Sequence, residues 1–307
     1  MKIAIPDLVS NSYLPAIAAA ELGYLKQEGI DATHELIYPV SKCYEALRDG
    51  KVDFVGGSAH SVPSAFPEWR GAKLIGALAQ GTYWFLVMRA DLNARRGDVG
   101  VVKGKRIGAA PMVDLGLKQL LKESGIDLER DQVTIAPVPG SAAAGVSFGV
   151  NAAKALEEGK LDGFWANGMG AEVAVRRKIG TMVIDVRRGD GPKSAFDYTF
   201  PVLVTTTALI ERDPAQAAAA VRALVKTQKA LRENVKLATD IGRKLFPAFE
   251  AGLIADVVER DLPFYDATIS QQAGEGTARF AQVSGLARQV ASYQDIVATQ
   301  FSSLWKG

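Results

Sequence analysis

The chain has 307 residues, 36 Lys and Arg against 34 Asp and Glu, one cysteine and two histidines. A single core rarely serves more than ~250–300 residues, so this length predicts two lobes. The near-neutral charge does not indicate a basic surface of the kind that binds nucleic acid. The spacing of the Cys and His residues does not match that of metal ligands. No apolar run approaches the ~20 residues that a membrane span requires. We expect no nucleic acid, no membrane span, no metal and no organic cofactor.

The first part of the chain is predicted to alternate strands with helices. Residues 3–6 form an apolar strand, and a polar loop then leads to a helix over residues 15–25. A strand over 32–38, a helix over 41–50 and a strand over 52–55 follow. Residues 56–61 are expected to form a small polar turn, whose backbone N–H groups could hold a polar or anionic ligand group.

The chain is then predicted to enter a second lobe and to return from it. The first crossing lies between the apolar strands at 73–79 and 85–88. The second lobe has a helix over 114–124 and strands at 106–110, 133–138, 163–166 and 182–186. A strand over 200–206 returns to the first lobe, and helices follow from Pro214. The predicted lobes are 1–83 plus 200–307, and 84–199.

An internal repeat links the two lobes. The segment ALRDGKVDF at residues 46–54 recurs as ALEEGKLDG at 155–163, and GID recurs at 29–31 and 125–127. Both lobes therefore follow one βαβαβ plan. Ligands of open α/β sheets bind beyond the carboxyl ends of the strands. The repeat predicts a ligand site in a cleft between the lobes.

Three segments carry a family resemblance. Residues 13–30 (YLPAIAAAELGYLKQEGI), 46–59 (ALRDGKVDFVGGSA) and 104–108 (GKRIG) resemble the nitrate, sulfonate, taurine and thiamine-pyrimidine-precursor binding family. The match runs in order over roughly the first two thirds of the chain. It implies an α/β periplasmic-binding-protein-like fold of type II. Each lobe would be a sheet flanked by helices, with two crossovers between the lobes and hinge closure on one small molecule.

The topology of that family places ligand contacts in the loops after the strands. In this sequence these are Asn11, Ser12, Tyr13, Ser41, Ser58, Ala59, His60, Met112, Val113, Trp165 and Asn167. Trp84 is added because an indole offers a flat apolar face and one N–H group.

Each of these residues also has a structural interpretation. Ser41 and Ser58 suit helix N-caps, and core packing is the default for Trp84 and Trp165. His60 has no evident carboxylate partner, so it is expected to contact ligand or support the fold and not to catalyse. We assign no catalytic residue.

Two further residues are interpreted as structural. Cys43 falls inside the helix after the second strand and is expected to be a small, partly buried side chain and not a nucleophile. Asp7 follows the first strand. It could pair with a cationic ligand group or bond its own backbone in a turn.

The resemblance implies a monomeric solute-binding protein that delivers a sulfonate, carboxylate or pyrimidine-like molecule to an ABC permease. An enzyme on the same fold, decarboxylase-like or active in pyrimidine-precursor metabolism, is the alternative. A ligand sensor is a third. Desulfinase-like members carry a Cys after the first strand and pyrimidine synthases a Cys-rich motif, whereas this chain has only Cys43. No leader pattern precedes residue 3, which predicts a periplasmic protein if a leader was removed and a cytoplasmic one otherwise.

Overall fold

The computed structural model describes residues 1–143 and 145–306. It divides into two compact units, Met1–Gly81 with Asp197–Gly307 and Thr82–Phe196. Each unit is an α/β domain with its own five-stranded sheet, and each is described by itself. Within the described residues, no helix combines the length and the apolar character that crossing a membrane would require.

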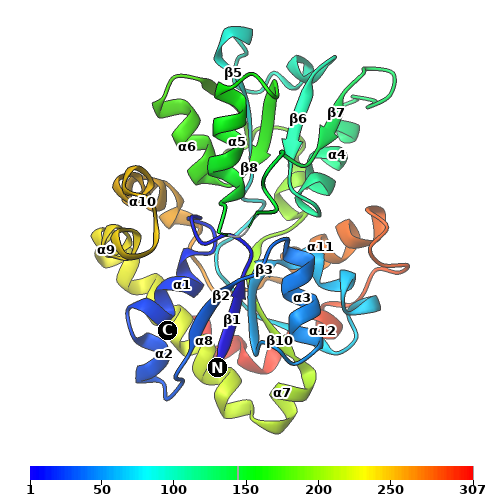
Figure 1. Ribbon diagram of the computed structural model, residues 1–307. Helices are drawn as coiled ribbons and strands as arrows, with labels where there is room; N and C mark the ends of the chain where they lie inside the picture. Colours follow the sequence, from blue (N-terminus) through cyan, green and yellow to red (C-terminus); the bar gives the residue numbers. More distant parts are fainter. Residues whose placement is uncertain (144, 307) are drawn as a thin grey trace. The chain divides into compact units, whose positions relative to one another are not determined.

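The sheet of the first unit has the strand order β2-β1-β3-β10-β4 (Figure 1). Its strands are β1 Lys2–Ile5, β2 Thr33–Leu36, β3 Phe54–Ser58, β4 Ala72–Ala77 and β10 Pro201–Thr206. Strand β10 runs antiparallel to both β3 and β4, while β1, β2 and β3 are parallel. The carboxyl ends of β1, β3 and β4 therefore share one edge with the beginning of β10.

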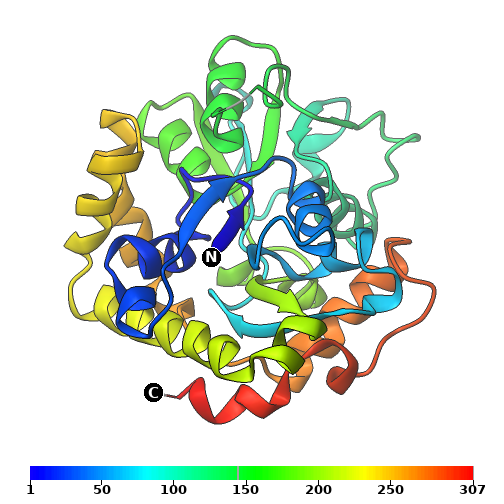
Figure 2. The same ribbon diagram turned by 60° about the horizontal axis from the view of Figure 1, so that its bottom comes forward.

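Helices cover this sheet. They are α1 Leu14–Glu21, α2 Tyr24–Gln27, α3 Val40–Arg48, α7 Thr207–Arg212, α8 Pro214–Glu233, α9 Lys236–Leu245, α10 Ala248–Asp261, α11 Gln271–Val283 and α12 Tyr293–Ile296. The longest, α8, begins where the Asp213 carboxylate accepts the Gln216 N–H at 3.0 Å and where Pro214 occupies the first turn. Figure 2 shows α8 running past α1 and α2, which it contacts.

The sheet of the second unit repeats that order with different strands, as β7-β6-β8-β5-β9. They are β5 Phe85–Arg89, β6 Arg106–Ala109, β7 Thr134–Ala136, β8 Gly163–Ala166 and β9 Gly180–Asp185. The helices are α4 Val113–Glu123, α5 Phe148–Glu157 and α6 Gly168–Arg176. Strand β5 is antiparallel to β8 and β9, so it occupies the place that β10 has in the first unit.

The sequence repeat is visible in the helix ends. Gly50 follows α3 and Gly159 follows α5, and both adopt a left-handed φ of 68°. The Gly50 N–H donates to the Leu47 carbonyl and the Gly159 N–H to the Leu156 carbonyl, each at 3.1 Å. Glycine adopts a positive φ without steric cost, which explains its place in both copies.

Both copies of the repeat contain an aspartate that accepts a hydrogen bond from the first residue of a neighbouring strand, β1 or β6. The Asp53 carboxylate accepts the backbone N–H of Lys2, and the Asp162 carboxylate accepts that of Arg106, each at 2.9 Å. Asp162 additionally pairs with the Arg106 guanidinium at 3.1 Å.

We predict that Asp162→Asn weakens the second unit by about 1–2 kcal/mol at neutral pH, because it removes the charge from this pair. Partial burial disfavours the charged form, but the side-chain and backbone hydrogen bonds from Arg106 outweigh it and hold the Asp162 pKa below its usual value. The stabilisation is complete above the unfolded pKa of ~3.9 and is lost as the pH falls through the folded pKa. Urea unfolding at several pH values, followed by hydrogen exchange of Arg106–Ala109, measures it. A wild-type advantage that does not shrink below pH ~4 would contradict this assignment.

The predicted turn at residues 56–61 is wrong in its first half. Gly56, Gly57 and Ser58 continue β3, because each pairs with a residue of β10. The return strand supplies a partner that local sequence does not reveal. Only Ala59–Ser64 leave the sheet, as a 3-10 helix.

Candidate functional site

The loop after β1 packs against the C-terminal part of the same unit. Asn11 is fully buried, and its side-chain amide donates to the Asp261 carboxylate. The Tyr265 hydroxyl donates to the Asn11 backbone carbonyl at 2.8 Å. These contacts orient Asn11, whose side-chain Oδ1 has no hydrogen-bond partner among the described residues.

The two residues that follow Asn11 in this loop are also buried. The Ser12 N–H donates to the Ser10 hydroxyl at 3.3 Å, while the Ser12 hydroxyl has no partner among the described residues. Tyr13 is buried and precedes α1. Asp7 accepts the Val9 N–H at 3.0 Å, which confirms the turn interpretation of that carboxylate.

The 3-10 helix after β3 brings His60 to the same edge of the sheet. Its imidazole is buried, with Nδ1 3.0 Å from the Thr199 hydroxyl and Nε2 3.4 Å from the Ser61 hydroxyl. The ring also packs on Phe280, with centroids 5.1 Å apart. Thr199 reaches His60 because it lies two residues before the antiparallel strand β10, whose first residue, Pro201, pairs with Ser58. Sequence reasoning did not select Thr199, whose only signal is that position.

Neither predicted serine cap forms a capping hydrogen bond. Pro39 is the N-cap of α3, and Ser41 is the second residue of that helix. Ser58 precedes the 3-10 helix, but its hydroxyl lies 2.7 Å from the Ser61 hydroxyl. The Ala59 N–H donates to the Phe200 carbonyl at 3.0 Å, which ties this helix to the return strand.

The carboxyl end of β8 in the second unit holds an indole pair. Trp165 is completely buried, and its N–H group has no partner among the described residues. Trp84 precedes β5 and packs edge-on against Trp165, with ring centroids 6.3 Å apart. A Cβ at Gly116 would lie 3.1 Å from the Trp84 ring, so the ring would have to shift by a few tenths of an ångström to admit a larger residue where α4 passes the pair.

The remaining predicted residues start two helices of the second unit. Met112 adopts a left-handed φ of 73° just before α4, where Val113 begins, and both are half-buried. Asn167 caps α6, and its side-chain carbonyl accepts the Gly170 N–H at 3.2 Å. Both loops follow neighbouring strands, β6 and β8.

The structure adds residues that local patterns did not select. Asp261 and Tyr265 belong to the C-terminal helical region, far in sequence from Asn11. Arg187 follows β9 and is buried, with its guanidinium carbon 5.9 Å from the centre of the Tyr83 ring.

Cys43 is completely buried, more than the partial burial that the sequence predicted. Its side chain is buried and its thiol donates to the Ile37 carbonyl at 3.0 Å. Burial raises the pKa of the Cys43 thiol far above its usual value, which opposes formation of a reactive thiolate. Within residues 1–143 and 145–306, no group of three His, Cys, Asp or Glu side chains could hold a metal ion.

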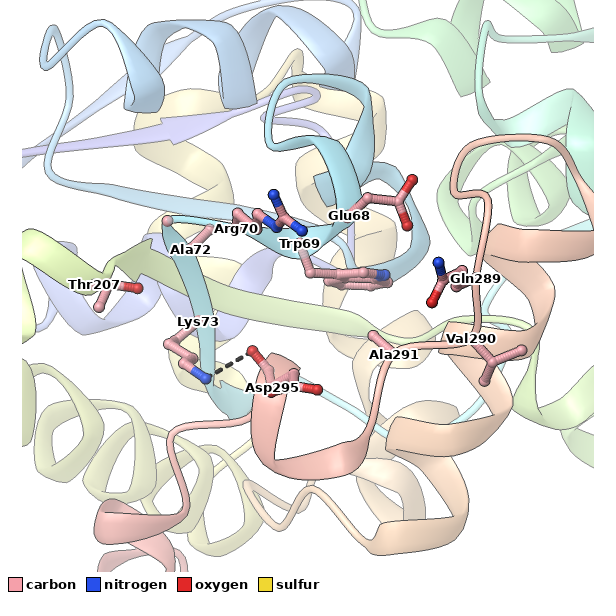
Figure 3. A pocket seen from close by; sticks show the side chains of 11 residues that line it. Glu68, Trp69, Arg70, Ala72, Lys73, Thr207, Gln289, Val290, Ala291 and Asp295 are labelled. Atoms are coloured by element: carbon pink, nitrogen blue, oxygen red, sulfur yellow. Dashed lines mark hydrogen bonds between the residues drawn. The ribbon is translucent and has the colours of Figure 1, made fainter.

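A pocket of about 560 Å³ lies at the opposite edge of the first unit's sheet (Figure 3). It is lined by residues at the start of β4 and after β10, including Lys73 and Thr207, and by Trp69 and Asp295. The Lys73 ammonium donates to the Gln294 and Asp295 carbonyls at 2.7 and 2.6 Å, and burial lowers its pKa. This pocket lies at the amino ends of the parallel strands, away from the predicted ligand contacts of the same unit.

Comparison with solved structures places the fold. The alkanesulfonate-binding protein SsuA from Xanthomonas axonopodis pv. citri, bound to MOPS, is 15% identical over 98% of this chain and 96% of its own, with a TM-score of 0.70. The periplasmic nitrate-binding protein NrtA from Synechocystis PCC 6803 is 13% identical over 99% of this chain and 86% of its own, also at 0.70. The desulfurization enzyme DSZB is 15% identical over 98% of this chain and 97% of its own, at 0.63. These likenesses confirm the predicted two-lobed α/β fold.

Comparison by sequence gives two results. The search of curated proteins finds no match. The family model described as NMT1/THI5 like matches residues 10–236, which is more than half of the chain. The matched range includes every strand except β1 and every predicted ligand residue. The chain therefore belongs to the NMT1/THI5-like family.

Proposed function

We propose that this protein is a solute-binding protein, which captures a small organic molecule and delivers it to an ABC importer. One observation carries the proposal. Buried polar atoms without partners occur at the carboxyl ends of strands in both units, namely Asn11 Oδ1, Ser12 Oγ and Trp165 Nε1. An unsatisfied buried polar atom costs about 1–3 kcal/mol, so such atoms are retained where an external group completes them.

The proposed ligand is a sulfonate, carboxylate or pyrimidine-like molecule, contacted by the loops after the strands of both units in a cleft between the two lobes. The MOPS-bound alkanesulfonate-binding protein supports the sulfonate among these ligands, and the nitrate-binding protein supports a small anion. Hinge closure of the two units would enclose the ligand, and a monomer suffices for that motion. Because NrtA is periplasmic, we propose the same compartment here.

An enzyme on the same fold is the second candidate, and the resemblance to the desulfurization enzyme DSZB is the observation in its favour. Against it, the one cysteine is buried with a raised pKa. The His60 imidazole lies between two hydroxyl groups, 3.0 Å from that of Thr199 and 3.4 Å from that of Ser61.

The two candidates differ in what happens to the ligand. Freshly purified protein would be denatured and any released small molecule identified by mass spectrometry, followed by thermal-shift assays with sulfonates, aromatic carboxylates and pyrimidines. A compound that raises the melting temperature and is recovered unchanged supports capture. A compound that is converted during incubation supports the enzyme.

We further predict that Trp165→Phe weakens binding of that compound about 10-fold, because the ring remains while its buried N–H donor is lost. Titration calorimetry measures the affinity. Trp69→Phe is the matched control, since Trp69 is equally buried, also lacks a partner for its N–H, and lines the pocket at the opposite edge of its sheet. Equal losses of affinity in the two variants would show that general destabilisation causes the loss, and would contradict a ligand contact by Trp165.

A further inference from the structure

We infer that the first unit recognises an N–H donor of the ligand, an amine or ammonium group, and that Asn11 is the residue that selects it. This inference rests on the proposed function and names the chemistry that one part of the proposed site accepts. It begins from the orientation of a single amide. One N–H of the Asn11 side-chain amide donates to the Asp261 carboxylate, which fixes the orientation of the amide and leaves Oδ1 as its acceptor.

The orientation of Asn11 is fixed from two directions. Asp261 is completely buried and accepts from the side chain, while the Tyr265 hydroxyl donates to the Asn11 backbone carbonyl. A rotation of the amide would bring its oxygen against the Asp261 carboxylate, which is unfavourable because two acceptors would meet. Asp261 and Tyr265 are therefore positioning residues, and Asn11 Oδ1 is held as an acceptor.

That acceptor has no donor in the described part of the chain. Asn11 is 0% exposed, and its Oδ1 lacks a hydrogen-bond partner, as does the hydroxyl of the adjacent, equally buried Ser12. A ligand N–H group would satisfy Asn11 Oδ1, and Ser12 Oγ can accept a second N–H. A sulfonate or carboxylate oxygen could not satisfy Asn11 Oδ1, because both atoms would be acceptors.

The charges around this loop favour the same chemistry. Asp7 belongs to this loop, and Asp261 contacts it through Asn11; both carboxylates are buried. The Arg260 guanidinium Nε lies 3.8 Å from the Asp261 carboxylate. Burial raises the pKa of Tyr38 to about 12, and the negative charge of Asp7 is a second, smaller cause of that increase. Carboxylates beside the loop favour a donor or cation there and disfavour an anionic end of the ligand. The acidic end of an aminated ligand would then lie away from this loop.

The test compares pairs of compounds that differ in one group. In 2-aminoethanesulfonate and 1-propanesulfonate an ammonium replaces a methyl group, and in 4-amino-2-methylpyrimidine and 2,4-dimethylpyrimidine an amine replaces a methyl group. Affinities of the wild-type protein are measured by titration calorimetry. We expect the aminated member of the pair that binds to be about 10- to 100-fold tighter.

Variants then locate the preference. Asn11→Leu is expected to reduce the ratio of the two affinities to within about threefold, because the acceptor is lost. Ser12→Ala, a smaller change that preserves packing, is expected to reduce it partly. Gln289→Leu is the control, because it removes an exposed amide from the pocket at the opposite edge of the sheet and should leave the ratio unchanged.

The outcomes separate this inference from the function on which it rests. Equal binding of both members of a pair by the wild-type protein overturns the donor inference and leaves solute capture standing, with water completing Asn11. A wild-type preference that survives Asn11→Leu overturns the assignment to Asn11. Binding of no compound from either pair overturns the proposed sulfonate and pyrimidine ligands and the inference with them.

Discussion

Replacing Phe54 by alanine is expected to destabilise the first unit by about 3–5 kcal/mol, because the change leaves a cavity in a filled core. Phe54 is completely buried and begins β3, where it pairs with Ile3 of β1. Its counterpart in the sequence repeat is Gly163, which begins β8 in the second unit. The same position of the repeat thus holds a large aromatic residue in the first unit and a glycine in the second.

The second copy has no room at that position. A Cβ at Gly163 would lie 2.8 Å from the Val87 carbonyl oxygen and would meet the Met88 sulfur. Strand β5 therefore fills, from the neighbouring strand, the volume that Phe54 fills in the first unit. Gly163→Ala is expected to destabilise the second unit by about 1–3 kcal/mol through overpacking, although it adds only a methyl group.

Hydrogen exchange of Lys2–Ile5 and of Arg106–Ala109 reports the two units separately, because these strands pair with β3 and β8. Phe54→Ala should accelerate exchange in the first segment, and Gly163→Ala in the second. Phe54→Leu is the control and should cost less, since it keeps much of the volume. A gain in stability from Gly163→Ala would show that β5 does not fill this space.

The sequence predicted the parts of the fold that rest on local signals. The helix ends at Gly50 and Gly159 follow from a repeated Gly-Lys-x-Asp pattern, and each glycine adopts the same φ of 68°. Most predicted strands also lie within a few residues of their true bounds, since β-branched and apolar runs between glycines define them. Because the pattern occurs twice, each helix end that it predicts is supported by two separate segments of the sequence.

Long-range contacts are what the sequence could not predict. Asn11 is oriented by Asp261, which lies 250 residues away in the chain. The extension of β3 through Gly57 depends on β10, which joins the sheet only after the whole second unit. Propensity is a weak guide where a distant strand supplies the partner. The loops of the candidate site were therefore predictable from strand ends, but not the groups that fix them.

The close approach of two helices in the second unit yields the prediction that connects stability with the proposed ligand site. Helices α5 and α6 meet at Gly149 and Gly170. A Cβ at Gly170 would lie 2.6 Å from the Gly149 carbonyl oxygen and 2.7 Å from its Cα. Both atoms belong to the backbone, so no change of rotamer can relieve the clash.

Gly170→Ala is expected to destabilise the second unit by about 3 kcal/mol and to weaken ligand binding, because α6 must move and carry its N-cap, Asn167, with it. Thermal unfolding and titration of the same protein sample measure both effects. Gly252→Ala is the matched control. This helical glycine of α10 has no atom within 4 Å of its Cβ position, so alanine should stabilise the protein by about 0.5–1 kcal/mol and leave affinity unchanged. If Gly170→Ala instead lowered stability without changing affinity, the beginning of α6 would not take part in binding, and Asn167 would be a helix cap only.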